Sequence, residues 1–392
     1  MNEVPIIGVL SPVTGGFYYG RVLAGINRVV HAAGGRIVFV QTLDAGISSD
    51  EVTVATDFSQ PIAWDHLDGA ISIATGITRE YLERLVARGV PVAIVSEVAD
   101  GLDVPTAAPD NAGGVAAAVD HLIGHGHTRI GFAGNLVQND MRERYAGYRA
   151  AMAAHGLEVC DDWVVTASDN GEVGGESVAR QLLAAPLPVS ALICATDRNA
   201  IGLLATLAEH GVCVPEDLAV VGFDGTETSA YTEPALTTVS QRFDEVGAAA
   251  ARLVLDAVAG HPHGRERHVV AADLLVRQSC GCGNDRAALD PAAELAFWRA
   301  EAAEHFARSD RRERRMREQY EIGIRLLNHD LAAPQALGWL AGTDVRAAAL
   351  AVWDGDPANG RLRIAGVYDR DGDRGDTIGE VVSVASFPAG PS

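Results

Sequence analysis

The fold is decided where an apolar run passes directly into a helical repeat: residues 191–211 read ALICATDRNAIGLLATLAEHG. The segment Ala191–Cys194 is wholly apolar and too short for a helix, which predicts a buried strand. From Asn199 to His210 the apolar residues recur with helical period, and Gly211 stands where a left-handed helix cap is needed. A strand followed by an amphipathic helix is the repeating unit of a parallel α/β sheet.

The same unit recurs from Ile6 to about Ala271. The predicted strands are Ile6–Leu10, Arg36–Val40, Gly69–Ile73, Val92–Val95, Ile130–Ala133, Ala191–Cys194 and Leu218–Phe223. The predicted helices are Tyr19–Ala33, Thr78–Arg88, Asn111–His125, Arg142–His155, Gly174–Ala184, Asn199–His210 and Asp244–Ala259. This number of strand–helix units is too large for one sheet, and the extended stretch Asp103–Pro109 interrupts their alternation near the middle. We therefore expect two doubly wound parallel-sheet lobes.

The character of the sequence changes after Gly283. Residues 287–333 are rich in Ala, Glu and Arg and predict a helical linker with a coiled-coil seam. Residues 335–392 predict part of an α+β domain that the chain truncates, beginning with a hairpin of Ala347–Trp353 and Leu362–Tyr368.

Composition excludes several classes of activity. The chain has 392 residues and a formal net charge of −21, and all 31 basic residues are arginine. Without lysine there is no P-loop, no Schiff base and no kinase-type catalytic lysine. An acidic surface also disfavours autonomous nucleic-acid binding. The arginines of Arg308–Glu318 alternate with acids, which favours a solvated helix face over a nucleic-acid contact.

The five cysteines are odd in number and irregular in spacing, which does not predict a secreted disulfide framework. The N-terminus lacks the pattern of a signal peptide, and no apolar stretch approaches the length of a membrane span. We therefore expect a cytoplasmic protein without membrane contact.

Two carboxylates follow predicted strands and should project at the carboxyl edge of a sheet: Asp197 after Ile193–Thr196, and Asp224 after Val220–Phe223. Hydrogen bonding to a bound polyol is the favoured interpretation. Capping of the following helix is the alternative, and acid–base catalysis is disfavoured because no nucleophile or metal set accompanies them.

Arg144 on a predicted helix could aim its guanidinium at hydroxyls or a carboxylate of a ligand, or form a surface ion pair. Phe17 and Tyr18 follow the first strand, where aromatic rings could stack on a sugar or pack in the core.

Two groups have residue types that bind metals. His121, His125 and His127 include a pair one helical turn apart, but no third ligand is evident nearby. Cys280 and Cys282 have neither Cys-x-x-Cys spacing nor a second pair. We expect helix capping for the histidines, core packing for the cysteines, and neither metal nor cofactor.

Several of these segments together resemble the effector-binding core of LacI/GalR-type transcriptional regulators. They are HLIGHGHTRI (121–130), DRNAIG (197–202), GVCVP (211–215), VGFD (221–224) and PALTTVSQ (234–241). The resemblance implies a periplasmic-binding-protein-like type I fold for residues 1–283. Its N-lobe would span about 1–108 and 242–271, and its C-lobe about 109–241 and 272–282. Three crossovers would fall near Ala108–Asp110, Gln241–Phe243 and Ala271–Ala272.

The resemblance also implies which residues contact the effector. These are Phe17, Tyr18, Thr75 and Ser96 on the N-lobe, Arg144, Asn170, Asp197 and Asp224 on the C-lobe, and Gln241 at the hinge. The family often has an aromatic residue where Asn170 stands, and Asn or Asp where Ser96 stands.

The expected function is that of a non-enzymatic sensor of a small polar effector, a sugar or a nucleoside, in a chain that forms homodimers. The first core strand begins at Ile6, so DNA contact would require a helix-turn-helix headpiece that this chain lacks. One alternative is a repressor trimmed of its headpiece. Another is the input region of a signalling enzyme such as a diguanylate cyclase, with a GAF-like module after the linker. An extracytoplasmic solute receptor is disfavoured because no export signal is evident.

Overall fold

A computed structural model describes residues 4–13, 15–42, 58–97, 101–184 and 188–283, and, towards the C-terminus, 337, 340, 347–355, 359–370, 378–383 and 385. The chain divides into two compact units, one of Met1–Ser59 and Leu67–Asn284, the other of Gln60–His66 and Asp285–Ser392. None of the described helices has both the length and the apolar composition that crossing a bilayer requires.

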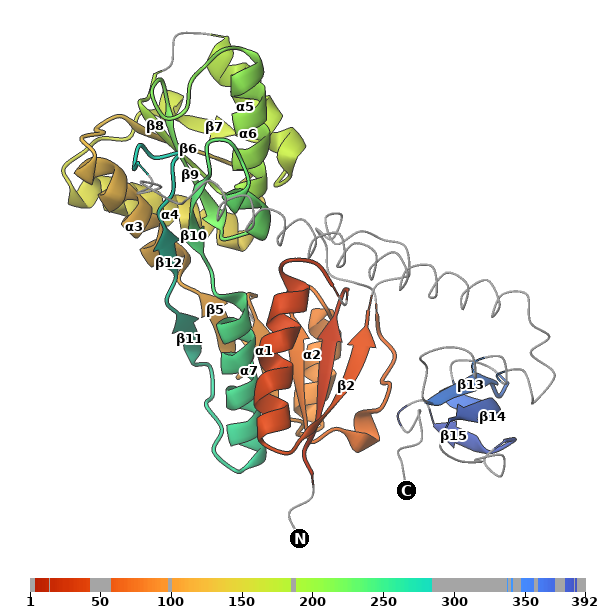
Figure 1. Ribbon diagram of the computed structural model, residues 1–392. Coiled ribbons are helices and arrows are strands. Elements are labelled where there is room, and N and C mark those ends of the chain that lie inside the picture. Colours follow the sequence, from red (N-terminus) through yellow and green to blue (C-terminus); the bar gives the residue numbers. More distant parts are fainter. Residues whose placement is uncertain are drawn as a thin grey trace, which may run out of the picture. The chain divides into compact units, whose positions relative to one another are not determined.

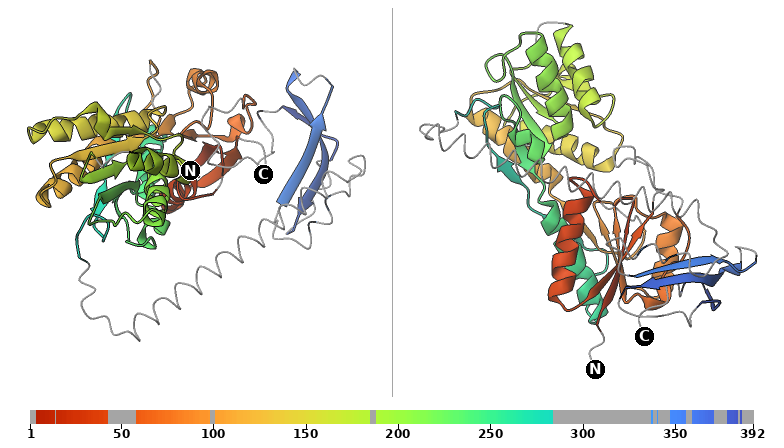
Figure 2. Two further views of the ribbon diagram at one scale, coloured as in Figure 1. Left: turned by 90° about the horizontal axis from the view of Figure 1, so that it is seen from above. Right: turned by 45° about the vertical axis from the view of Figure 1, so that its right-hand side comes forward.

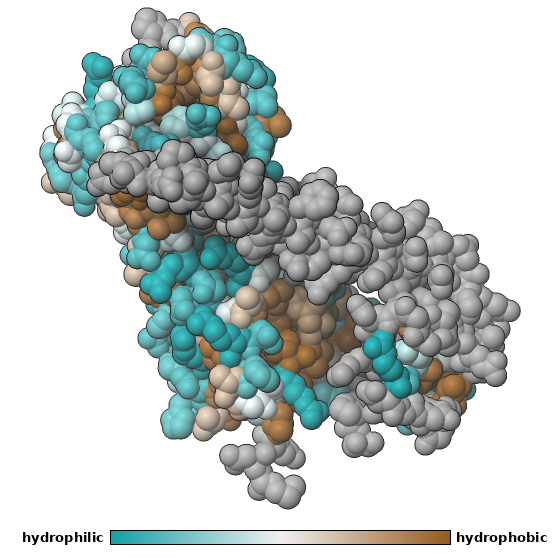
Figure 3. All heavy atoms as spheres, in the orientation of Figure 1, coloured by the Kyte–Doolittle hydropathy of each residue, from teal (hydrophilic) through white to brown (hydrophobic). Residues whose placement is uncertain are grey.

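The N-lobe of the first unit is built on a six-stranded sheet in the order β11-β5-β4-β3-β1-β2 (Figure 1). Its strands all pair in parallel and are β1 (Ile6–Ser11), β2 (Arg36–Gln41), β3 (Gly69–Ile73), β4 (Val92–Val95), β5 (Thr106–Pro109) and β11 (Arg267–Val270). The lobe's helices are α1 (Tyr19–Ala32), α2 (Arg79–Ala87) and α7 (Phe243–Val258). Apolar residues of β1, β3, α1 and α7 share one buried core. In the view of Figure 3, hydrophobic residues also show at the surface of this lobe.

The C-lobe repeats this design in the order β12-β10-β9-β8-β6-β7. Its strands are β6 (Ile130–Gly134), β7 (Val164–Thr166), β8 (Ala191–Cys194), β9 (Ala219–Asp224), β10 (Thr237–Ser240) and β12 (Asp273–Leu275), of which β12 alone runs antiparallel to its neighbour. One core lies under α3 (Asn111–Gly124) and α4 (Asn139–Ala154), and a second under α5 (Glu172–Leu183) and α6 (Asp197–Glu209). Helices therefore cover both faces of the sheet (Figure 2).

The chain passes between the two sheets three times, which confirms the predicted fold class of two parallel-sheet lobes joined by three crossovers. It leaves the N-lobe sheet after β5, returns between β10 and α7, and leaves again between β11 and β12. Each passage falls on a crossover that the family resemblance implies.

Several element boundaries differ from prediction. Helix α4 begins at Asn139 rather than Arg142, and α6 begins at Asp197, with the hydroxyl of Thr196 accepting a hydrogen bond from Asn199 N as its cap. Strands β5, β7, β10, β11 and β12 were not predicted, and the stretch Asp103–Pro109, which contains β5, was expected only to be extended. Each has three or four residues and is defined by its pairing partner rather than by a local apolar pattern.

Two glycines let α1 and α7 cross with their backbones almost touching. A Cβ atom on Gly25 would lie 1.8 Å from the carbonyl oxygen of Asp244. A Cβ atom on Gly247 would lie 2.1 Å from the carbonyl oxygen of Val22. Only glycine fits at either position without moving a helix.

The described part of the second unit contains a three-stranded antiparallel sheet in the order β13-β14-β15. Strand β13 (Ala347–Trp353) pairs with β14 (Arg361–Asp369) in a hairpin, and β14 pairs with β15 (Val381–Ser383). The predicted helical linker, residues 287–333, lies outside the described residues. Assignment of residues 335–392 to a GAF-like domain stays a prediction.

Candidate functional site

The guanidinium of Arg144 is buried inside the C-lobe, with only 2% of the side chain exposed. Its Nη1 lies 3.1 Å from Oδ1 of Asp224 and 2.5 Å from the carbonyl oxygen of Ala195. Its Nε donates to Oδ1 of Asn111 at 3.1 Å, and its Cζ lies 4.1 Å from the centre of the Phe223 ring. The alternative of a surface ion pair is therefore wrong. Asn111 completes this network and was not predicted from the sequence.

Asp224 ends strand β9 and joins Arg144 to the hinge. Its Oδ1 also accepts a hydrogen bond from Nε2 of Gln241 at 2.6 Å. Burial raises the pKa of Asp224 to about 7, even though the neighbouring Arg144 favours the carboxylate. The structure thus brings three of the predicted site residues, Arg144, Asp224 and Gln241, into one buried network.

The raised pKa of Asp224 predicts that the first unit loses stability as the pH rises. The unfolded carboxyl releases its proton near its ordinary pKa of about 4, whereas the folded one retains it until about pH 7. Proton release in this window favours the unfolded state, so the stabilisation is complete below about pH 4 and is lost as the pH rises through about 7.

Urea denaturation of the wild type and of Asp224→Asn checks this pH dependence, because the asparagine side chain does not titrate between pH 5 and pH 8. From about pH 5 to pH 8 the free energy of unfolding of the wild type should fall by about 2 kcal/mol relative to the variant. A difference that is independent of pH, or that changes in the opposite direction, would contradict the assignment.

Asp197 follows strand β8, as predicted, but it is the first residue of α6, and the strand ends earlier, at Cys194. Its Oδ2 accepts hydrogen bonds from the backbone N of Thr226 at 2.7 Å and from Oγ1 of the same residue at 2.9 Å. Its Oδ1 accepts from the hydroxyl of Thr238. Burial raises its pKa, and these donors oppose the shift. The carboxylate thus ties the loop after β9 to β10, which favours a structural role; effector contact by Asp197 stays a prediction.

Asn170 lies on the loop between β7 and α5, near the start of α4. Its Nδ2 donates to Oε1 of Gln138, the residue before α4, at 2.8 Å. Its Oδ1 is buried and has no hydrogen-bond partner among the described residues. An unpaired buried acceptor is costly for a fold, and a ligand donor could satisfy it.

The N-lobe residues of the predicted site follow β1, β3 and β4. The Tyr18 ring meets the edge of Phe243 with 5.0 Å between centroids, so it packs in the core as the alternative interpretation held. Phe17 is 40% exposed and remains available to a ligand. Ser96 lies beside the Tyr18 hydroxyl, and neither buried hydroxyl makes a well-formed hydrogen bond among the described residues. Thr75, after β3, is half-buried.

Two electrostatic interactions connect the N-lobe with α4 of the C-lobe. Burial raises the pKa of Tyr18 well above its usual range, and a smaller contribution comes from Asp140, which lies on α4 of the C-lobe. Glu143 of α4 and Arg267 of β11 form an ion pair between the lobes, with 2.7 Å between Oε2 and Nη2.

Backbone strain concentrates at strand ends of both lobes. Positive φ occurs at Ala74 after β3, Ser96 after β4, Asp224 at the end of β9 and Arg242 after β10. Such conformations are unfavourable for residues other than glycine, and they tend to cluster at functional sites.

Two of the three histidines, His121 and His125, lie together with Cys280 and Cys282, contrary to expectation. Nε2 of His121 is 3.2 Å from Sγ of Cys280, and Nε2 of His125 is 3.0 Å from Sγ of Cys282. The prediction that the histidine pair has no further ligand nearby is therefore wrong. His127 lies apart, with Nδ1 2.9 Å from Oγ of Ser190.

Comparison with known proteins agrees with this architecture. Residues 119–280 match the family described as periplasmic binding protein-like domain. The HTH-type transcriptional repressor PurR of Photobacterium profundum is 26% identical over 281 residues, which cover 71% of this chain and 82% of the repressor.

Solved structures show the same similarity. A LacI-family transcriptional regulator from Sanguibacter keddieii superimposes with a TM-score of 0.56 and 27% identity over 71% of this chain and 100% of its own. The transcriptional regulator CelR in complex with cellobiose gives a TM-score of 0.58 and 28% identity over 70% of this chain and 84% of the regulator. With its two lobes, three crossovers and these relatives, the first unit of this chain is similar in fold and sequence to the effector-binding domains of LacI-family transcriptional regulators.

Proposed function

We propose that the first unit senses a small polar metabolite, a sugar or a nucleoside, bound between the carboxyl edges of the two sheets, and does so without catalysing a reaction. The observation that carries the proposal is the buried network of Arg144, Asp224 and Gln241, which places a cation and a carboxylate next to the second crossover. The strained strand ends and the unpaired oxygen of Asn170 support the same location. The cellobiose in the CelR complex supports a sugar.

Binding would favour one arrangement of the lobes over another. Reversing a 1:99 population requires the ligand to prefer one form by about 5.5 kcal/mol. Hydrogen bonds to charged groups contribute about 1.5–3 kcal/mol each, so a few contacts with such groups are sufficient. Because the relatives regulate transcription, we propose that the lobe movement is passed to an output that controls gene expression, and that the chain acts as a homodimer.

The experiment is a thermal-shift titration of the full chain with maltose, cellobiose, ribose, adenosine and a set of amino acids. A compound at about 100 times its Kd stabilises by about 2.7 kcal/mol, which should raise Tm by at least about 3 °C. We expect such a shift with a sugar or a nucleoside and none with the amino acids.

Phe17→Ala should then reduce affinity at least about tenfold, because the exposed ring is lost without disturbing the core. Val4→Ala is the matched control: Val4 is 45% exposed but precedes β1, at the opposite edge of the same sheet. Equal affinity in both variants would refute the site, and a shift with amino acids alone would refute the effector class.

A further inference from the structure

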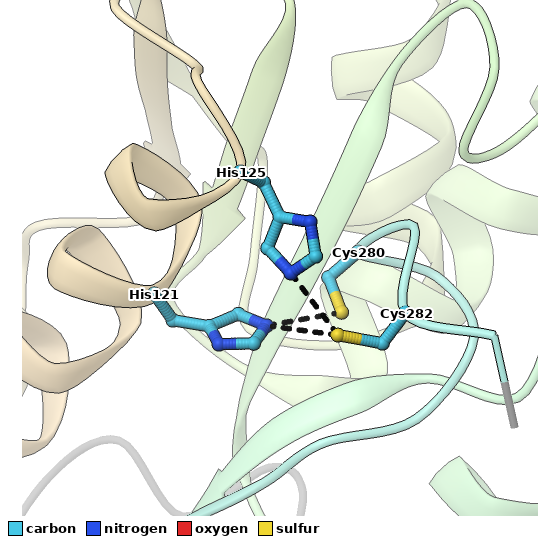
Figure 4. A group of neighbouring side chains, drawn as sticks. All are labelled: His121, His125, Cys280 and Cys282. Carbon is cyan, nitrogen blue, oxygen red and sulfur yellow. Dashed lines mark hydrogen bonds between the residues drawn. The ribbon is translucent and has the colours of Figure 1, made fainter. Parts of the chain in front are cut away.

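We propose that His121, His125, Cys280 and Cys282 form a binding site for one zinc ion in the C-lobe (Figure 4). The two imidazoles project from α3 and the two thiols from the segment after β12, and all four point toward a common centre. The four ligand atoms lie within 4.8 Å of one another.

The spacing of these atoms suits a tetrahedral zinc ion. Zn–S bonds of about 2.3 Å and Zn–N bonds of about 2.0–2.1 Å give ligand-to-ligand distances of about 3.3–3.8 Å. The nitrogen-to-sulfur distances are 3.2 Å between His121 and Cys280, 3.0 Å between His125 and Cys282, and 3.6 Å between His121 and Cys282. These three distances differ from the tetrahedral values by a few tenths of an ångström, and a pair at the 4.8 Å limit would have to close by about 1 Å to bind one zinc ion.

The fold prepares each pair of ligands separately. His121 and His125 are one helical turn apart, so they share a face at the end of α3. Gly281 has a φ of +92°, a conformation that favours glycine, and forms the turn between the two cysteines.

The surroundings hold one thiol in place and leave the other end of the site open. Cys280 is 1% exposed, and the hydroxyl of Thr237 donates to its sulfur at 3.1 Å. Next to it, the hydroxyl of Ser279 donates to the carbonyl oxygen of Val220. His125 is exposed and Cys282 half-buried, so a metal ion can enter from solvent.

Ligand chemistry selects the metal and its role. Two thiolates and two imidazoles suit zinc, whereas magnesium and calcium prefer oxygen ligands. Four protein ligands leave no open position for water or substrate, which is typical of structural rather than catalytic zinc. The ion would join α3, which follows the first crossover, to the last residues of the first unit and so fix the segment that leaves the C-lobe.

The test uses the full chain, reduced with a phosphine, stripped of metal with a chelator, and then titrated with Zn²⁺ or Co²⁺. We expect one zinc per chain by mass spectrometry of metals, a higher Tm with zinc, and a cobalt spectrum with thiolate charge-transfer and intense tetrahedral d–d bands. Cys282→Ser, at a half-buried position, should retain the fold but lose zinc during dialysis against a competing chelator.

Two matched controls lie outside the cluster. Cys213→Ser removes an exposed free cysteine, and His127→Ala removes the third histidine of the same motif; both should retain one zinc. The proposal is overturned if the reduced chain binds no stoichiometric zinc, if Cys282→Ser retains it, or if both cysteines react with a thiol reagent equally fast with and without zinc. Isolation of a Cys280–Cys282 disulfide under these reducing conditions would also overturn it.

Discussion

Replacing Arg144 by leucine is expected to lower the free energy of unfolding of the first unit by about 3–5 kcal/mol, the usual cost of removing one partner of a buried ion pair. The Asp224 carboxyl would then stay buried without its cation, and Oδ1 of Asn111 and the carbonyl oxygen of Ala195 would each lose a donor. Leucine and arginine have similar helix propensities, so the substitution should not change the intrinsic stability of helix α4. Urea denaturation at about pH 8, above the pKa of about 7 of Asp224, measures the change with the carboxylate ionised in the wild type.

The control for this substitution lies on the same helix. Arg149 is exposed and contacts only the Tyr145 ring, at 6.0 Å, among the interactions of the described residues, so Arg149→Leu should change stability by less than about 0.5 kcal/mol. The double variant Arg144→Leu/Asp224→Asn removes both charges, keeps a residue type that tolerates the positive φ at 224 and an acceptor for Gln241, and should recover much of the loss. A loss below about 1 kcal/mol for Arg144→Leu, or no recovery in the double variant, would show that the pair does not stabilise the lobe.

The cost of Arg144→Leu also bears on how the site could sense a ligand. A buried cation held by one carboxylate, one amide oxygen and one carbonyl oxygen has donors fixed in direction before any ligand arrives. Such preorganisation reduces the entropy lost on binding. The same network therefore supports both stability and the proposed recognition of hydroxyl groups.

Most of the fold could be predicted because its elements are locally encoded. Strands such as Val92–Val95 and Ala191–Cys194 are continuous apolar runs, as expected for parallel strands buried on both faces, and their observed bounds match the prediction. By contrast, Thr237–Ser240 is a mostly polar segment that becomes a strand because β9 and β12 pair with its two edges. No local pattern marks such a segment.

The candidate site was less predictable because it depends on contacts between distant residues. The apolar run before Asp224 correctly indicated a strand end, but nothing in the sequence distinguishes a buried Arg144 from a surface one. His121 and Cys280 are separated by 159 positions, and the cysteine segment reaches the end of α3 through the pairing of β12 with β10 and the hydrogen bonds between Ser279 and Val220. Spacing rules search for ligands that are close in sequence, so they treated the two halves of this cluster separately.

The second large effect is expected where α1 and α7 cross. Gly25→Ala would place a Cβ atom 1.8 Å from the carbonyl oxygen of Asp244 and 3.0 Å from the backbone N of Ala248. These obstacles are backbone atoms, which cannot rotate away as a side chain would, so the helices must separate. We expect a loss of about 3 kcal/mol or more in the free energy of unfolding, at or above the upper end of overpacking costs.

A glycine-to-alanine substitution at a helical position with free space should instead raise the free energy of unfolding. This difference makes the prediction specific to the crossing of α1 and α7. Gly124 is the last residue of α3, and a Cβ atom there would meet nothing within 4 Å. Gly124→Ala should therefore stabilise by up to about 1 kcal/mol through helix propensity alone.

Gly247→Ala should be as destabilising as Gly25→Ala, because its Cβ would lie 2.1 Å from the carbonyl oxygen of Val22 at the same crossing. Once one Cβ has pushed the helices apart, the second meets less resistance, so the double variant should lose clearly less than the sum of the two single losses. If urea denaturation gave additive losses, each clash would be relieved by its own local movement, and the prediction that the two helices separate as a unit would be wrong.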